Sequence, residues 1–445
     1  MVPSAVLVVR RWSGLILIGI AAAMLLWLRI PAVARDTLWA EDGRQFLAGA
    51  ERYGVLNLLT PYAGYLQVVP RLIAGVVVTI PVDQWARGMT AGACIVSGAV
   101  TVLVYVCAAS VVPARTPRLV LAAVTVLLPL GPRDVFGNPT NIHSVLMWGL
   151  FWVLLAGPES RRARITLSVA GLVCALSEIQ SLFLVPLVLV RVRRPEGRLL
   201  MLGPALGMLA EIVATVVVPR SAAHAAPVGV PSLLLGYLIN AVLTLFTSIS
   251  KVGPAILSGA LWVAGLLLAF VLALVVVAWR RLLPRARLAT VAALILSPLI
   301  YIASVVVNPA DYYDYATMST EQLGDAWITR YGVVPGMLLL AVAIIAAAAL
   351  IRGGTTTALP DRSRSARPTL RQAIAAATLV AIVLSFTVYF VPSWTRRSDG
   401  PQWAPAVHSA AASCATSSTR TIWIKETLGW HVPVPCSRIL QTVHR

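Results

Sequence analysis

Two adjacent carboxylates, Glu41 and Asp42, are the pair whose residue types and spacing best suit chemistry. They lie early in a polar segment, 37–71, which continues with a helical apolar pattern and then with an aromatic, glycine-containing stretch bearing Tyr62 and Tyr65. An acidic pair at the edge of a hydrophobic run can serve general acid–base catalysis. The pair could instead only cap the following helix, because a helix N-terminus favours negative charge.

Segment 131–144 carries residue types that bind divalent cations. Oxygen ligands suit magnesium or manganese, and an imidazole suits manganese. The candidate ligands are Asp134 and His143, then Asn138, Asn141 and Asp42. The Asn-Pro-Thr-Asn sequence in this segment equally predicts a turn held by asparagine side chains, and we favour the turn. Asn141 and His143 are also candidate substrate contacts.

Glu178 lies between two apolar runs. A carboxylate in that position needs a partner or a water-filled cavity, because burying a lone charge in a bilayer is costly. A structural ion pair with Arg133 or Arg330 would meet this need. Binding of a polar substrate is the functional alternative, and Glu178 is therefore a candidate substrate-binding residue.

Segment 308–331 combines carboxylates with aromatic side chains. Such a mixture binds sugars by stacking and hydrogen bonding, although aromatic residues are also common anchors at a membrane interface. The segment ends in Arg330 and Tyr331 at the start of an apolar helix. Because the fork of a guanidinium group suits a phosphate, we predict that Arg330 binds substrate. We predict the same of the aromatic residues Tyr331, Tyr62 and Tyr65.

The composition is that of a membrane protein. Of 445 residues, 58% are hydrophobic and 12% are charged, and the mean hydropathy is +0.83. These values predict an all-α polytopic membrane protein embedded in a lipid bilayer. The net charge of +19 comes mostly from arginines in short clusters between apolar runs. That distribution sets membrane topology and does not form the single basic face that a nucleic acid partner would need.

Apolar length and arginine placement predict about eleven transmembrane helices, with the N-terminus in the cytoplasm and the C-terminus outside. The expected spans are 12–30, 89–112, 119–130, 145–156, 165–176, 182–190, 199–218, 254–278, 288–307, 333–351 and 370–390. In the first outer loop, 31–88, segment 66–81 is predicted to be a juxtamembrane helix, because counting it as a crossing would place every later arginine cluster outside. A cleaved signal peptide is the alternative for the first run.

The chain divides into a transmembrane domain, 1–391, and a small extracytoplasmic tail, 392–445. The inner loop 352–371 is rich in Gly, Thr, Ser and Arg, which predicts a flexible linker. In the tail, the alternation at 421–425 predicts a short strand. Cys414 and Cys436 are the two cysteines outside apolar runs, and we expect them to form a disulfide in an oxidising compartment.

The first outer loop resembles that of the GT-C superfamily of polytopic membrane glycosyltransferases. The resemblance rests on Ala40-Glu41-Asp42-Gly43, on the helix start Val69-Pro70-Arg71-Leu72, and on a second crossing that begins at Arg87. It covers mainly residues 1–200 and the start of the helix at Arg330. It implies inverting transfer of a hexose or pentose from a polyprenyl-phosphate donor, with Asp42 as the general base and Glu41 second. The family often shows Asp before Glu, so the reversed order here leaves the choice between them open.

We therefore expect a glycosyltransferase that moves a sugar from a polyprenyl-phosphate donor to a cell-envelope glycan or glycolipid acceptor. Basic residues that are nearly all arginine, together with much alanine and valine, indicate a GC-rich bacterium and hence the bacterial plasma membrane. A magnesium or manganese ion is the one cofactor that the residues suggest. The alternatives are a transporter or flippase of lipid-linked sugars and a noncatalytic relative. We find no internal repeat of the kind on which many transporters are built.

Overall fold

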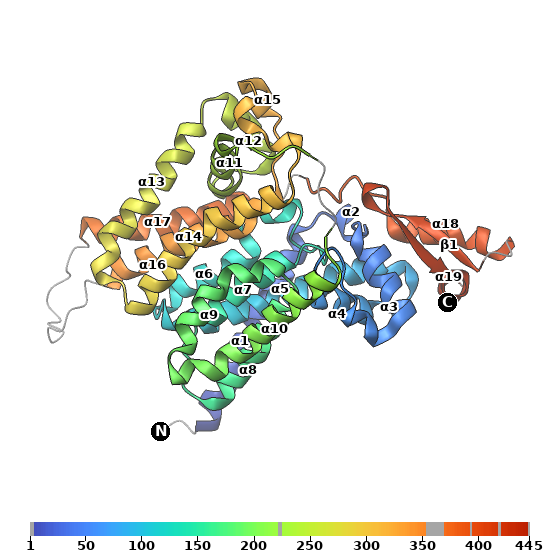
Figure 1. The fold of residues 1–445 in the computed structure, drawn as a ribbon, viewed down its shortest axis with the longest axis horizontal. Helices are drawn as coiled ribbons and strands as arrows, with labels where there is room; N and C mark the ends of the chain where they lie inside the picture. Colours follow the sequence, from blue (N-terminus) through green and yellow to red (C-terminus); the bar gives the residue numbers. More distant parts are fainter. Residues whose placement is uncertain (1–3, 221–224, 353–368, 392–393, 417–419, 444–445) are drawn as a thin grey trace.

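The computed structural model describes residues 4–220, 225–352, 369–391, 394–416 and 420–443. Most of the linker expected at 352–371 lies outside these ranges, from 353 to 368. The described chain forms a bundle of helices followed by a small C-terminal domain with two strands (Figure 1).

Seven helical stretches in the described ranges are long and apolar enough to cross a membrane. They are Trp12–Arg29 in α1 (Ser4–Arg29), Val82–Ser110 around α5 (Trp85–Cys107), Pro195–Val217 (α10), Leu261–Arg281 with α13 (Leu261–Ala278), Pro284–Val307 (α14), Arg330–Arg352 with α16 (Val333–Arg352) and Leu370–Val388 (α17). A bent pair, Val230–Leu245 and Ile249–Leu257, meets at 119° and would add an eighth. These helices have the character of a multi-pass membrane protein.

The structure does not confirm the expected count of about eleven spans. Four of the predicted spans form shorter helices: α6 (Arg115–Leu127), α7 (His143–Leu155), α8 (Arg161–Ala175) and α9 (Val185–Val192). The longest of these has 15 residues. At 1.5 Å per residue it covers roughly 22 Å, against about 30 Å for the hydrocarbon core of a bilayer.

The single helix predicted at 254–278 is divided in two. α12 (Ile249–Leu257) ends just before Gly259, whose φ of +84° lies in the left-handed region that favours glycine. α13 begins two residues later, at Leu261. A glycine in this conformation stops the helix, so the apolar run that looked continuous in sequence changes direction here.

α16 lies at the centre of the bundle. All its residues from Val333 to Leu350 are buried, and α6, α7, α13, α14 and α17 pack around it. A helix that is apolar on every side is stable only when other helices or lipids cover it. The alanines at 346–349 also let neighbouring helices approach closely.

Between α1 and α5 the chain folds into a compact segment. It contains α2 (Ala32–Arg35), η1 (Asp42–Leu47), α3 (Ala48–Tyr53), η2 (Gly54–Leu59), α4 (Val68–Val77) and η3 (Val82–Gln84). α4 has 10 residues and packs against η1 and α5. A helix of this length is shorter than a membrane crossing, in agreement with the expectation that 66–81 does not cross.

Short elements connect the remaining helices. They are η4 (Ala108–Ser110), η5 (Gly131–Arg133), η6 (Ile179–Leu184), α11 (Val230–Tyr237), η7 (Leu238–Val242), η8 (Leu243–Leu245), η9 (Trp279–Arg281), η10 (Asp311–Tyr313), η11 (Tyr315–Thr317), α15 (Thr320–Gly324) and η12 (Arg330–Gly332).

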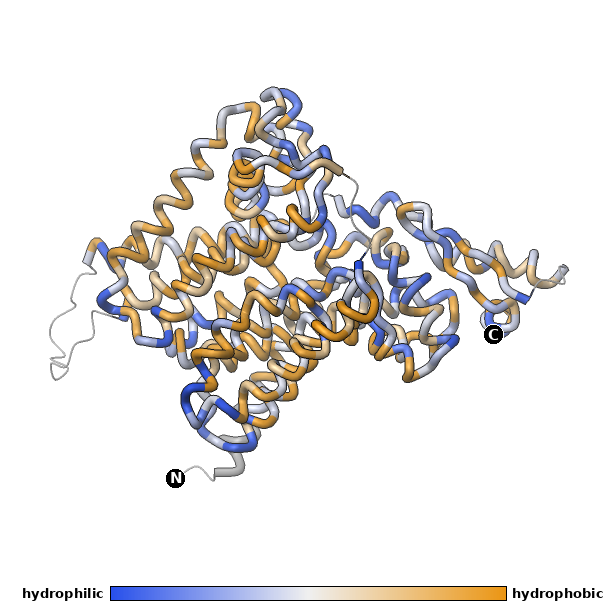
Figure 2. Tube along the Cα trace, viewed as in Figure 1, coloured by the Kyte–Doolittle hydropathy of each residue, from blue (hydrophilic) through white to orange (hydrophobic). Residues whose placement is uncertain are grey.

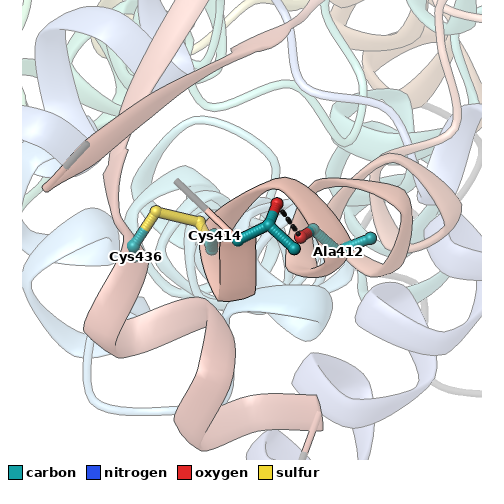
Figure 3. The surroundings of a disulfide bond; sticks show 4 residues. Ala412, Cys414 and Cys436 are labelled. Atoms are coloured by element: carbon teal, nitrogen blue, oxygen red, sulfur yellow. Dashed lines mark hydrogen bonds between the residues drawn. A yellow bond between two sulfur atoms is a disulfide. The ribbon is translucent and has the colours of Figure 1, made fainter. Parts of the chain in front are cut away.

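The C-terminal domain consists of α18 (Trp403–Thr416), β1 (Thr421–Lys425), β2 (His431–Pro435) and α19 (Cys436–Val443). The two strands pair antiparallel with Ile424 opposite Val432, and the expected strand at 421–425 is confirmed. A disulfide joins Cys414 to Cys436, the pairing that the sequence predicts, and Figure 3 shows how it ties the end of α18 to the start of α19.

Apolar residues line the helices of the bundle, and hydrophilic residues gather at its ends and on the C-terminal domain (Figure 2). The start of α1 and the C-terminal domain lie at opposite ends of the molecule (Figure 1). The segment between α1 and α5 lies beside the C-terminal domain, so the first loop and the tail meet at one end of the bundle.

Candidate functional site

Asp42 is buried, with 1% of its surface exposed. Its Oδ1 accepts hydrogen bonds from the backbone N–H of Thr140 at 3.0 Å and from the Thr140 hydroxyl at 2.8 Å. Its Oδ2 accepts the backbone N–H of Trp39 at 3.3 Å. Both oxygens are therefore engaged, and Asp42 ties the first loop to segment 131–144.

Glu41 has a different environment from its neighbour. It is half-buried, and burial raises the pKa of its carboxyl. The nearby positive charges of Arg330, His143 and Arg220 oppose this shift and lower the pKa. The Glu41 carboxylate therefore interacts electrostatically with these three groups. The resemblance implies the base role first for Asp42, which stays a prediction; of the two residues, Glu41 is the more accessible.

Tyr62 and Tyr65 flank a tight turn. Each residue's backbone N–H donates to the other's carbonyl oxygen, at 2.9 and 3.2 Å. The turn is fixed to α10, because Glu211 accepts the N–H of Leu66 at 3.2 Å and the Thr215 hydroxyl donates to the Gly64 carbonyl at 2.5 Å. Burial raises the pKa of Tyr62, and the negative charge of Glu41 raises it further.

His143 and Glu178 form a pair through the imidazole Nδ1. The same carboxylate accepts the backbone N–H of Gln180 at 2.8 Å, and Glu178 is 3% exposed. Among the described residues, Glu178 thus pairs with His143 and not, as was expected, with Arg133 or Arg330. Tyr65 meets the His143 ring edge-on, with 6.4 Å between centroids. These contacts orient the imidazole.

Three guanidinium groups, those of Arg133, Arg330 and Arg396, gather around the carboxylate of Asp134. The Nε atoms of Arg396 and Arg133 lie 3.7 and 4.0 Å from its two oxygens, which is too far for hydrogen bonds. The Nε atoms of Arg133 and Arg330 are buried without a hydrogen-bond partner. Asp134 and Glu41, whose charges both act on Arg330, supply two negative charges against three positive ones. The arginine cluster therefore keeps a net positive charge, which suits an anion.

Aromatic rings hold two guanidinium groups of the arginine cluster in place. Arg133 lies 4.8 Å from the ring centroid of Trp327, and Arg396 lies 4.5 Å from the same centroid. Arg396 also lies 5.0 Å from the ring of Trp39. A guanidinium stacked on a ring keeps its N–H edge free for a planar or tetrahedral anion.

Asn240, which the sequence did not single out, fixes the start of the helix that carries Arg330. Its Oδ1 accepts the backbone N–H of Thr329 at 2.7 Å, and its Nδ2 donates to the Tyr315 hydroxyl at 3.1 Å. Arg330 in turn lies 5.2 Å from the Tyr331 ring. An asparagine within an apolar helix was the available signal, since a polar side chain there needs partners.

The metal ligands expected in segment 131–144 do not converge. The side chains of Asn138 and Asn141 both donate to the Asp134 carbonyl, at 2.9 and 2.8 Å, which is the turn geometry. Asp134 lies among arginines and His143 pairs with Glu178. Within the described ranges, no three or more His, Cys, Asp or Glu side chains form a cluster that could hold a metal ion.

Two apolar grooves reach the same end of the bundle. One, of about 470 Å³, is lined by α1, α6 and α17 and includes Phe390. The Phe390 ring lies under Arg29, which also stacks on Phe136 in segment 131–144. The other, of about 540 Å³, lies between α10 and the segment from Leu59 to Leu66 that contains the tyrosine turn. A hydrocarbon chain from the bilayer could lie in either groove.

Comparison of the chain with protein-family models, with curated proteins and with solved structures gives no match.

Proposed function

We propose that this protein is a membrane glycosyltransferase that moves a sugar from a polyprenyl-phosphate donor to a hydroxyl of a cell-envelope glycan or glycolipid. The observation that supports the proposal is that an accessible carboxylate, Glu41, interacts electrostatically with Arg330, a member of the arginine cluster in which the Nε atoms of Arg133 and Arg330 are buried without a hydrogen-bond partner among the described residues. A lipid-phosphate sugar offers an anion and an attached hydrocarbon chain. The site offers cations, a carboxylate and apolar grooves in the same region.

In this reaction the acceptor oxygen attacks the anomeric carbon, and the bond between that carbon and the phosphate oxygen breaks. Glu41 takes the proton of the acceptor hydroxyl, which makes that oxygen a better nucleophile. The electron pair of the broken bond remains on the phosphate, whose charge changes from one to two negative. A single displacement of this kind inverts the anomeric centre, as the family resemblance implies.

Arg133, Arg330 and Arg396 stabilise the charge that develops on the leaving phosphate. Their effect is large because the cluster is largely buried, and charges in a water-poor site interact strongly. His143 and the two tyrosines of the 62–65 turn provide hydrogen bonds and ring surface for the sugars. The polyprenyl chain lies in the groove lined by α1, α6 and α17. Phe390 lines this groove, and Arg29 lies over the rings of both Phe390 and Phe136.

Purified protein in lipid nanodiscs, given radiolabelled polyprenyl-phosphate sugars and a mixture of cell-envelope glycans and glycolipids, tests the proposal. We expect label to move to an acceptor, and we expect the Glu41→Gln variant to lose this transfer. Absence of transfer with hexosyl and pentosyl donors would count against the proposal. Movement of the intact donor between leaflets, without any bond cleavage, would identify a flippase instead.

A further inference from the structure

The C-terminal domain binds the backbone of the acidic turn on the N-terminal side of Glu41. The Thr427 hydroxyl accepts the N–H of Ala40 at 3.1 Å and donates to the carbonyl of Leu38 at 2.9 Å. The backbone N–H of Thr427 also donates to the Leu38 carbonyl, at 3.3 Å. One residue of the tail therefore makes three hydrogen bonds to Leu38 and Ala40, two of the three residues that precede Glu41.

The preceding residue of the tail binds the other side of the turn. The Glu426 Oε2 accepts the backbone N–H of Gly43 at 3.2 Å. A Cβ on Gly43 would lie 2.2 Å from Val432 and 2.4 Å from the Glu426 carboxylate. The tail packs so closely here that only glycine fits at position 43. Thr427 therefore binds the backbone before Glu41, and Glu426 binds the backbone after it.

The backbone held in this way is strained. Ala40 has a φ of +34°, in the left-handed region that residues other than glycine rarely adopt. Such a conformation persists only where the surroundings fix it. Because the Thr427 hydroxyl binds the N–H of Ala40 itself, it stabilises the conformation that sets the direction of the next side chain, Glu41.

The tail is well anchored elsewhere, so it can act as a rigid support. The indole N–H of Trp403 donates to the Val82 carbonyl at 2.6 Å, and its ring stacks on Trp85. Arg397 donates to the Thr90 hydroxyl at 3.0 Å. The disulfide between Cys414 and Cys436 then links the two helices of the domain.

We infer that Thr427 and Glu426 are positioning residues that aim the Glu41 carboxylate at the acceptor, so that the C-terminal domain forms part of the catalytic site. This inference rests on the proposed function. Removing the Thr427 hydroxyl should let the strained turn relax and move Glu41 away from the reacting atoms. A misplacement of about 1 Å can reduce a rate by roughly 100-fold.

Thr427→Val, which keeps the shape and removes the hydroxyl, is the test variant. Thr427→Ser restores the hydroxyl. Thr416→Val is the matched control, because the Thr416 hydroxyl donates to the Ala412 carbonyl within its own helix. We expect Thr427→Val to lower kcat by about 100-fold with a donor KM within about twofold of the wild type. Thr427→Ser should recover most of the loss, and Thr416→Val should behave as the wild type.

Hydrogen exchange of the peptide covering residues 36–47 gives a readout that does not depend on activity. We expect Thr427→Val to speed exchange in this peptide while the disulfide and the helical content stay intact. Unchanged exchange and unchanged kcat in that variant would overturn the inference, as would an equal loss in Thr416→Val. A wild type without transfer activity would refute the proposed function, and the exchange result alone would then decide whether the tail fixes the turn.

Discussion

At the scale of single residues, the structure gives two neighbouring carboxylates different roles. Asp42 accepts three hydrogen bonds and is 1% exposed, so it holds two segments together. Glu41 is half-buried, and the charges of Arg330, His143 and Arg220 act on its carboxylate. A general base must reach the proton that it removes, and of the pair Glu41 has the better access.

The first prediction compares the two carboxylates. Glu41→Gln should lower kcat by about 100-fold or more, because an amide cannot take the acceptor proton. Asp42→Asn keeps an oxygen for the Thr140 contacts and should lower kcat by less. Transfer rates of both purified variants, with thermal stability as the control for folding, provide the comparison. A larger loss of kcat in a folded Asp42→Asn protein would return the base role to Asp42.

The second prediction concerns Arg330. Arg330→Lys should raise the donor KM about tenfold, or roughly 1.4 kcal/mol, because an ammonium group cannot grip a phosphate with two parallel N–H groups. Arg287→Lys is the matched control, since Arg287 is exposed and stacks on Trp279 outside the site. Titration of donor in the transfer assay measures both. Equal KM values in the two variants would remove Arg330 from the phosphate site.

The third prediction concerns pH. Burial is the main cause that raises the pKa of Asp42 to about 7 and that of Glu426 to about 9. The charge of Asp42 also raises the pKa of Glu426, whereas the hydrogen bonds from Thr140 and the charge of Arg397 lower the pKa of Asp42. The folded state therefore holds protons that the unfolded state releases. The contribution of Asp42 and Glu426 to the free energy of unfolding should therefore be greatest below about pH 4. It should be lost as pH rises through about 7 for Asp42 and about 9 for Glu426.

A neutral amide imitates the protonated carboxyl, so Glu426→Gln should flatten this decline. Melting temperatures at several pH values between about 4 and 9 measure the effect, with Glu159→Gln, an exposed position, as the control. A decline in Glu426→Gln as steep as in the wild type would show that Glu426 does not bind a proton on folding.

At the scale of elements, two features position the site. The tyrosine turn is fixed to α10 by Glu211 and Thr215, and the start of α16 is fixed by Asn240. All three of these polar side chains form hydrogen bonds with backbone groups next to apolar helices. A backbone group left without a hydrogen bond there would cost free energy. The two apolar grooves, one lined by α1, α6 and α17 and the other beside α10, are the surfaces on which the lipid chain of the proposed donor would lie.

The fourth prediction distinguishes the two grooves. Ala123→Trp fills the groove lined by α1, α6 and α17, and Ala210→Trp fills the groove beside α10. If the polyprenyl chain lies in the first groove, Ala123→Trp should raise the donor KM about tenfold or more, because the buried hydrocarbon contacts are lost. Ala210→Trp should leave it unchanged and serves as the control. The reverse pattern would assign the chain to the second groove.

At the scale of the whole molecule, the C-terminal domain folds back onto the first loop. Trp403, Arg397, Glu426 and Thr427 contact residues more than 300 positions earlier in the chain. The predicted topology agrees with this arrangement, because it places the first loop and the tail on the same side of the membrane. The orientation of that side relative to the cytoplasm is the subject of the last prediction.

The fifth prediction uses single introduced cysteines in intact cells. Thr79→Cys, between α4 and α5, should react with a membrane-impermeant maleimide, because arginine placement puts this turn outside. Glu159→Cys, between α7 and α8, should react only after the cells are opened. Both positions are exposed, and the natural cysteines Cys94, Cys107 and Cys174 are buried and should stay unlabelled. Labelling of Glu159→Cys alone in intact cells would reverse the predicted topology.

The sequence by itself determined the membrane class, the long helices, the short strand at 421–425 and the pairing of Cys414 with Cys436. These features follow from the length of apolar runs, from local alternation and from cysteine count, all of which are local in the chain. It did not determine the number of spans, because a run of apolar residues does not show where a helix ends. Gly259, with its left-handed backbone, divides one such run.

The tertiary structure decided how far each of the two carboxylates is buried and what holds the turn that carries them. Asp42 is held by Thr140, 98 residues away, and Gly43 by Glu426, 383 residues away. The pairing of His143 with Glu178 and the gathering of three arginines around Asp134 likewise join distant segments. Such contacts depend on how whole elements pack, and two adjacent acidic residues look alike in sequence until that packing buries one and leaves the other accessible.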